Sequence, residues 1–266
     1  MLSLLVTYLL CLFLLFVWQR KLIYFPEKLS LSEQKILARQ SKLTLWPDAD
    51  HYHALISQDS KAGSKGTIIV FHGNAGSANS RIQYINALEP LGYRVILAEY
   101  PGYAARPGTC TAQALIQDGI ATTKQVYAEF SSPIFLWGES LGSGIVSGIV
   151  QSGQTPIKGI TLITPFDSLG NVAQHHYWFF LAKWLLKDKF NNIVNLQNYT
   201  GKIAILQAGQ DEIVPKRLTE NLYRALPSNK KLWQFKTAGH NSLPWGTEHP
   251  WWHEVMQFLQ TERDEV

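Results

Sequence analysis

The chain has 266 residues, which is enough for one large domain with a short appendage. Its 24 basic and 20 acidic residues are scattered, and without a Lys/Arg-rich block nucleic acid is not expected as a partner. The two cysteines exclude a disulfide-stapled secreted domain, because Cys11 lies in an apolar N-terminal run and leaves Cys110 without a partner.

The N-terminal segment from residue 2 to residue 18 has no charged side chain and is dominated by Leu, Phe and Val. A run of this length lies near the lower limit, about 17 residues, for a helix that crosses a bilayer. We expect residues 1–20 to form an uncleaved, single-pass membrane anchor, because the features of a signal peptide are missing. Arg20 and Lys21 follow the run, so the positive-inside tendency predicts a main domain on the cytoplasmic side.

Strand-like and helix-like stretches alternate in the rest of the chain. Residues 21–40 are expected to be a helical linker, followed by a hairpin with strands at 43–46 and 52–56. Apolar runs then alternate with helical stretches such as 80–91 and 112–130. The pattern predicts an α/β domain over residues 41–266, with helices on both faces of a mostly parallel, eight-stranded sheet. The other six strands are expected at 67–71, 94–98, 134–137, 160–163, 203–207 and 232–236.

Reactive side chains follow three of these strands. Ser140 stands in a G-x-S-x-G pattern between a strand and a helix of small residues, where glycines permit a sharp turn. Asp211 and His240 follow two later strands, and the carboxyl ends of parallel strands meet at one edge of the sheet. We therefore predict a catalytic triad in which Ser140 is the nucleophile, His240 the general base and Asp211 the orienting acid. Glu212 is an alternative acid.

Attack by a serine places negative charge on the substrate carbonyl oxygen, and backbone N–H groups commonly stabilise it. One donor is expected from Leu141, the residue after the nucleophile. The second is expected from the loop of small residues that follows the strand at 67–71, with Asn74 favoured and Ala75 as the alternative. These N–H groups are the predicted oxyanion hole.

Six short motifs together resemble the Bem46-like α/β-hydrolases, which are commonly anchored to a membrane by an N-terminal helix. They are HGNAG at 72–76, EYPGY at 99–103, GESLG at 138–142, TPF at 164–166, DEIVP at 211–215 and GHN at 239–241. The resemblance implies the α/β-hydrolase fold, hydrolysis of a carboxylic ester, thioester or amide, a triad at Ser140, Asp211 and His240, and no cofactor. The loop at 99–104 departs from the family, since Pro101 stands for an arginine and Ala104 for a glycine.

The expected function is cleavage of an ester or thioester of a small-molecule or lipid-like acyl substrate through an acyl-serine intermediate. An aminopeptidase-like amide hydrolase and a catalytically silent, membrane-tethered binding protein are the alternatives. Deletion of the residues before Lys21 is expected to release an active, soluble domain.

Two further features bear on ligands. His51 and His53 share one face of a strand, but without a third ligand no metal site is predicted. The aromatic and basic stretch at 175–189 lies within 163–202, where a cap segment would be inserted. This stretch is compatible with a cap that binds an acyl chain, with a helix on a lipid surface, or with a helix packed on the sheet.

Overall fold

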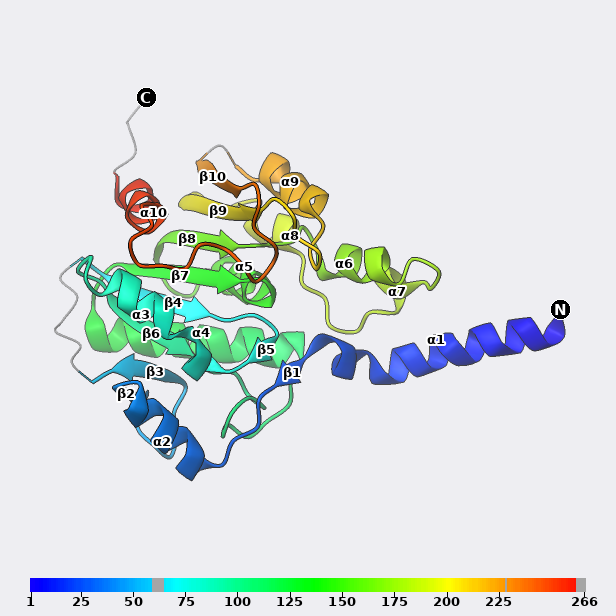
Figure 1. The fold of residues 1–266 in the computed structure, drawn as a ribbon, viewed down its shortest axis with the longest axis horizontal. Coiled ribbons are helices and arrows are strands. Elements are labelled where there is room, and N and C mark those ends of the chain that lie inside the picture. Colours follow the sequence, from blue (N-terminus) through cyan, green and yellow to red (C-terminus); the bar gives the residue numbers. More distant parts are fainter. Residues whose placement is uncertain (59–64, 228, 262–266) are drawn as a thin grey trace.

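The computed structural model describes residues 1–58, 65–227 and 229–261, so the last residues of the expected domain, 262–266, lie outside the described residues. The chain begins with the helix α1 (Leu2–Ile23), which projects away from the body of the protein (Figure 1). By length and composition α1 could cross a membrane, with a mean hydropathy of 2.2 over its most apolar window. It continues past residue 20, the expected end of the anchor, and its last turns contact the rest of the chain.

The central sheet has eight strands in the order β10-β9-β8-β7-β4-β6-β3-β2. Neighbouring strands are parallel except at β3, which is antiparallel to both β2 and β6. The predicted α/β fold with a mostly parallel sheet is thus confirmed. The strands are β2 (Leu43–Trp46), β3 (Ala54–Ser57), β4 (Thr67–Phe71), β6 (Arg94–Ala98), β7 (Ile134–Glu139), β8 (Ile157–Ile163), β9 (Lys202–Ala208) and β10 (Lys230–Phe235).

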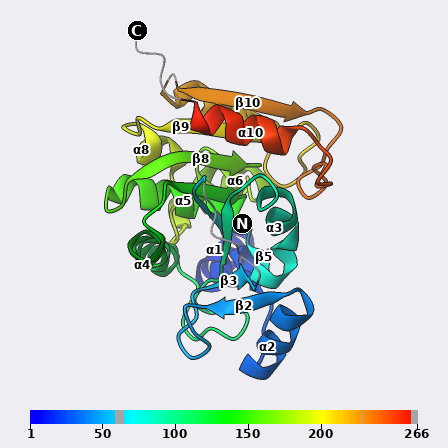
Figure 2. The ribbon, with the colours of Figure 1, turned by 90° about the vertical axis from the view of Figure 1, so that its left-hand side faces the viewer.

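Helices cover both faces of the sheet (Figure 2). Side chains alternate along each strand, so that Ile69 and Phe71 of β4 join one core cluster whereas Ile68 and Val70 join the other. The first cluster is closed by α4 (Ala112–Phe130), α5 (Leu141–Ser152), α8 (Asn192–Leu196) and α9 (Lys216–Ala225). The second is closed by α2 (Leu31–Gln40), α3 (Ile82–Leu88) and α10 (Trp251–Gln260).

Three local predictions differ from the structure. The helix expected at 80–91 is a 3₁₀ turn, η1 (Ala78–Arg81), followed by the short α3. The strand expected to begin at residue 52 begins at Ala54. A small parallel ladder between β1 (Phe25–Pro26) and β5 (Ala75–Gly76) interrupts the expected linker; strands of this length have no periodicity that a sequence pattern could reveal.

The segment between β8 and β9, which we call the cap segment, lies beside α1. It holds α6 (Leu169–His176) and α7 (Ala182–Leu185) and then returns to the sheet through α8. In Figure 1, α6 and α7 lie on the side of the molecule from which α1 departs.

Candidate active site

Ser140 occupies the sharp turn between β7 and α5. Its backbone has φ 51° and ψ −111°, a region that non-glycine residues seldom adopt. The neighbouring glycines are required by close backbone contacts: a Cβ on Gly138 would lie 2.6 Å from the carbonyl oxygen of Gly142, and a Cβ on Gly142 would collide with that of Phe71. The turn therefore presents the Ser140 side chain at the carboxyl edge of the sheet, as the G-x-S-x-G pattern predicts.

The three side chains predicted as a triad lie in one hydrogen-bonded row. The Nε2 atom of His240 is 2.9 Å from Ser140 Oγ, and its Nδ1 atom is 2.8 Å from Asp211 Oδ2. Both the His240 and the Asp211 side chains are almost fully buried, with 6% and 2% of their surface exposed. This row can pass the hydroxyl proton of Ser140 to the imidazole.

The loop after β9 holds the carboxylate of Asp211 in place. Asp211 Oδ1 accepts hydrogen bonds from the backbone N–H groups of Ile213 and Val214, at 3.0 and 2.7 Å. Glu212, the alternative acid, instead accepts the backbone N–H of His240 at 3.1 Å. Its own backbone N–H, and then that of His240, hold the pKa of Glu212 below its usual range. Glu212 therefore supports the His240 loop, and Asp211 alone meets the imidazole.

The predicted oxyanion donors lie on the wall of one cavity with Ser140. Among the described residues, the backbone N–H groups of Asn74 and Leu141 have no hydrogen-bond acceptor. Leu141 is also the first residue of α5, where helical N–H groups are unpaired and the helix dipole favours negative charge. Ala75 lines the same cavity, so the loop offers either residue as the second donor.

The Asn74 loop is held by the end of α1, a contact that the sequence did not reveal. The Asn74 side chain donates to the carbonyl oxygen of Ile23 at 2.7 Å. The backbone carbonyl oxygen of Asn74 accepts hydrogen bonds from the backbone N–H of Phe25 at 2.9 Å and from the hydroxyl of Tyr103 at 2.8 Å. The β1–β5 ladder continues this attachment. The conformation of a predicted oxyanion donor thus depends on the N-terminal segment.

The buried pair of His72 and Glu99 supports the Asn74 loop from inside the protein. His72 Nε2 lies 3.2 Å from Glu99 Oε1, and both side chains are fully buried. The other oxygen of Glu99 accepts the backbone N–H of Ala78 at 3.0 Å, and the hydroxyl of Tyr100 donates to the carbonyl oxygen of His72 at 2.6 Å. His72 and Glu99 each begin one of the short motifs, HGNAG and EYPGY. Their place in these motifs is the sequence feature that could have indicated a role in supporting the loop.

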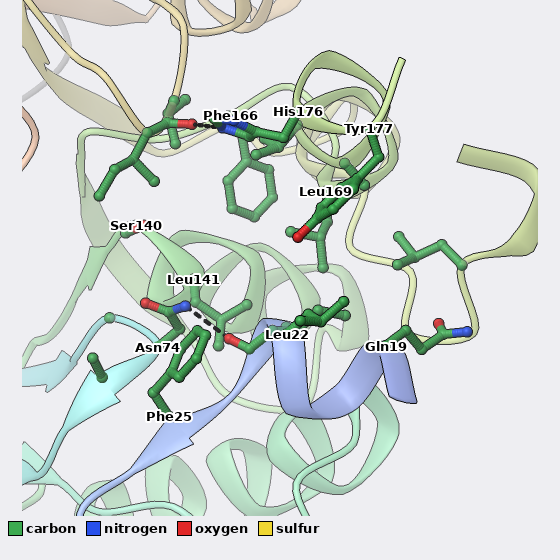
Figure 3. A pocket seen from close by; sticks show the side chains of 18 of the residues that line it. Gln19, Leu22, Phe25, Asn74, Ser140, Leu141, Phe166, Leu169, His176 and Tyr177 are labelled. Atoms are coloured by element: carbon green, nitrogen blue, oxygen red, sulfur yellow. Dashed lines mark hydrogen bonds between the residues drawn. The ribbon is translucent and has the colours of Figure 1, made fainter. Parts of the chain in front are cut away.

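Ser140 opens into a cavity of about 690 Å³ with mainly apolar walls. Figure 3 shows Gln19 and Leu22 of α1 on one side of it and Leu169, His176 and Tyr177 of the cap on another. The Nε2 atom of His176 lies 2.7 Å from the carbonyl oxygen of Ile213 and so ties the cap to the Asp211 loop. Other apolar lining residues are Leu15, Ile23, Phe25, Phe166, Val172, Phe180, Leu185, Leu186 and Val214.

The one carboxylate among the described lining residues is Glu139, and it is already paired. Arg81 holds it at 2.9 and 3.1 Å through two nitrogen atoms, and Tyr84 donates to it at 3.1 Å. Burial and the neighbouring Glu139 charge raise the pKa of Tyr84 well above its usual value, so this phenol stays protonated as a donor. The cavity therefore offers a substrate no free negative charge among these residues.

The histidines of the early hairpin do not converge. His51 lies 3.5 Å from Asp48, whereas His53 lies 3.4 Å from Asp118. Within the described ranges, no group of three His, Cys, Asp or Glu side chains is placed to hold a metal ion.

Comparison with known proteins gives relatives among lipases and esterases. An uncharacterised protein of Mycobacterium tuberculosis is 29% identical over 86% of this chain and 83% of its own. The mouse lysophosphatidylserine lipase ABHD12 is 27% identical over 72% of this chain, and the match spans about half (53%) of that lipase.

Solved structures share the fold. An esterase from Pyrococcus furiosus has a TM-score of 0.64 at 18% identity, over 77% of this chain and 84% of its own. A monoacylglycerol lipase from Paleococcus ferrophilus has a TM-score of 0.55 at 18% identity, over 74% and 95%.

The family model described as serine aminopeptidase, S33, matches residues 62–195, half of the chain. This stretch contains the Ser140 turn and the Asn74 loop. The chain belongs to this hydrolase family and is an enzyme of the α/β-hydrolase class.

Proposed function

We propose that the protein is a membrane-anchored serine hydrolase that cleaves a carboxylic ester or thioester through an acyl-serine intermediate. The observation that carries the proposal is the row of Asp211, His240 and Ser140 at the wall of an apolar cavity, with unpaired N–H groups beside the serine. This combination supplies a base, a nucleophile and oxyanion donors in one place.

The reaction follows from these positions. Ser140 Oγ attacks the substrate carbonyl carbon while His240 Nε2 takes its proton. The oxyanion that forms accepts hydrogen bonds from the backbone N–H groups of Leu141 and of Asn74 or Ala75. His240 then donates the proton to the leaving alcohol or thiol, and Asp211 stabilises the imidazolium and keeps its orientation. Water, deprotonated by His240, hydrolyses the acyl-Ser140 ester and restores the enzyme.

The cavity favours an apolar acyl group over an amino terminus. Its walls come mainly from Leu, Ile, Phe and Val side chains, which suit an acyl chain. The name of the matched family suggests an aminopeptidase, but recognition of a substrate ammonium group calls for a free carboxylate. Glu139 is neutralised by Arg81 and does not provide one. The lipase and esterase names among the relatives support an ester.

We further propose that α1 is the membrane anchor and that Arg20 and Lys21 keep the hydrolase domain on the cytoplasmic side. The anchor would comprise residues 1–20, the linker residues 21–40 and the hydrolase domain residues 41–266. The cap would lie within residues 163–202 of that domain.

Trapping of the intermediate tests the chemistry. The full chain in detergent micelles is mixed with a nitrophenyl ester, quenched within the first turnover and digested for mass spectrometry. We expect the acyl mass on the peptide that contains Ser140, and its loss in Ser140→Ala. Ser152→Ala is the matched control, because that serine lies at the far end of α5. Ester turnover that persists in Ser140→Ala would refute the mechanism, and ester binding without turnover would support the silent binding protein.

A further inference from the structure

The cap segment lies along α1 for about half of the length of that helix. At one end, the ring of Tyr8 stacks on Phe180 at 5.8 Å between centroids, and its hydroxyl donates to the carbonyl oxygen of Phe179 at 3.0 Å. At the other end, the Gln19 side chain donates to the carbonyl oxygen of Leu185 at 3.2 Å. Tyr8 and Gln19 are eleven positions apart, which is about 16 Å of helix.

The outer side of this segment is mainly apolar and faces away from the cavity, with Lys183 as its exposed charged residue. Trp178, Phe179 and Trp184 expose 66%, 66% and 78% of their surface, and Leu181 is also exposed. None of them lines the cavity around Ser140. Solvent-exposed aromatic side chains gathered on one short segment mark a surface that meets another apolar phase. We call residues 177–185 the cap loop.

The length of α1 indicates that the apolar phase in contact with the cap loop is the hydrocarbon layer of a bilayer. Its 22 residues span about 33 Å, little more than the roughly 30 Å of a bilayer core. A crossing α1 therefore has few residues to spare, and the stretch beside the cap loop must itself lie in the apolar layer. Since Tyr8 and Gln19 hold the cap loop to that stretch, the loop cannot stay in water while α1 is inserted. Lys187, whose Nζ lies 3.9 Å from the Phe16 ring, places a cation where the loop leaves this layer.

We infer that the cap loop inserts into the same leaflet as α1, and that a long acyl chain enters the cavity sideways between the two. The cavity wall is built from both elements, with Leu15 and Leu22 from α1 and Tyr177, Phe180 and Leu185 from the cap. An acyl chain can thus move from the leaflet to Ser140 between apolar surfaces. The substrate class is an ester of a long acyl chain that resides in the membrane; this part rests on the proposed function.

The depth of the cap loop can be measured without any catalysis. Trp184→Cys is labelled with an environment-sensitive fluorophore in the full chain, after Cys11→Ala and Cys110→Ala, and reconstituted into phosphatidylcholine vesicles. Ile36→Cys, on the exposed side of α2, is the matched control. We expect nitroxide-labelled lipids to quench the probe at position 184 at least threefold more than the probe at position 36. Equal quenching at the two positions would overturn the inference.

Lateral entry is tested with two esters of different solubility. The double variant Trp178→Ser, Trp184→Ser should turn over a water-soluble acetyl ester within twofold of the unaltered chain, yet hydrolyse a long-chain monoacyl ester in vesicles at least tenfold more slowly. Ile36→Ser with Tyr127→Ser, two exposed apolar residues on α2 and α4, should leave both rates unchanged. Equal rates on the vesicle ester in both double variants would overturn lateral entry. Failure of the unaltered chain on both esters would refute the proposed function, while the quenching result would still decide the membrane contact.

Discussion

The ion pair between Arg20 and Asp188 provides a quantitative test of how firmly α1 is built into the hydrolase domain. Arg20 Nε lies 2.8 Å from Asp188 Oδ2, and the Asp188 side chain is only 4% exposed. Asp188 Oδ1 also accepts the backbone N–H of Ala112, the first residue of α4, at 2.9 Å. One carboxylate therefore joins the end of α1, the loop after α7 and the start of α4.

The variant Arg20→Ala would leave this carboxylate buried without its cation. Removing one partner of a buried ion pair costs about 3–5 kcal/mol. Arg20 is about half exposed, so solvent already screens part of its charge, and the hydrogen bond to Ala112 and the dipole of α4 persist. We therefore expect a loss of about 2–3 kcal/mol in the free energy of unfolding, which corresponds to a melting temperature lower by about 5–10 °C.

The assay is thermal unfolding of the full chain in detergent micelles, together with a double-mutant cycle. Asp188→Asn removes the charge but keeps an acceptor for Ala112, so Arg20→Ala combined with Asp188→Asn should regain most of the lost stability. A melting temperature that changes by less than about 1 °C in Arg20→Ala would refute the reasoning. In that case the pair of Arg20 with Asp188 would not contribute to holding α1 against the domain.

Three further outcomes follow from the site. Asp211→Asn should lower the turnover of a soluble ester by about 10³–10⁴-fold, whereas Glu212→Gln should lower it by less than about tenfold, since only Asp211 meets the imidazole; similar losses in both would contradict this assignment. Gly142→Ala should abolish soluble expression or labelling of the serine, because its Cβ would collide with the Phe71 carbonyl, and a fully active variant would disprove that contact. Deletion of residues 1–24 should lose activity on soluble esters while deletion of residues 1–7 keeps it, and equal activity would show that the end of α1 is dispensable.

The chemistry-bearing residues could be predicted because their signals are local. Ser140 follows β7 directly, and Asp211 and His240 lie in the short loops after β9 and β10; parallel strands bring such positions to one edge of a sheet. Gly138 and Gly142 predict the sharp turn in the sequence. The structure requires glycine at both positions because neither has room for a side chain. The continuous apolar runs likewise marked the buried strands.

The role of the N-terminal helix could not be predicted, because its contacts join residues that are far apart in the sequence. An apolar run of Leu, Phe and Val has the same pattern whether lipid or a substrate cavity lies beside it. The bond from Asn74 to Ile23 and the pair of Arg20 with Asp188 are single polar contacts without periodicity. Because residues of α1 line the cavity and hold the Asn74 loop, we expect removal of the whole helix to impair the site, whereas the apolar run alone indicated only a membrane anchor.

The broken helix at 80–91 has a similar explanation. Arg81 turns toward Glu139 at 2.9 Å, and Tyr84 donates to the same carboxylate, so this region is shaped by a side chain from β7. A helical pattern in the sequence carries no information about such a partner.

The central claim is that Ser140 is a nucleophile activated by His240. Covalent labelling of the full chain by a fluorophosphonate probe, compared with Ser140→Ala and His240→Ala, tests it most directly. We expect strong labelling of the unaltered chain, none in Ser140→Ala, and a labelling rate at least about 10³-fold lower in His240→Ala. A well-folded, unaltered chain that takes up no probe, or equal labelling in all three, would contradict it.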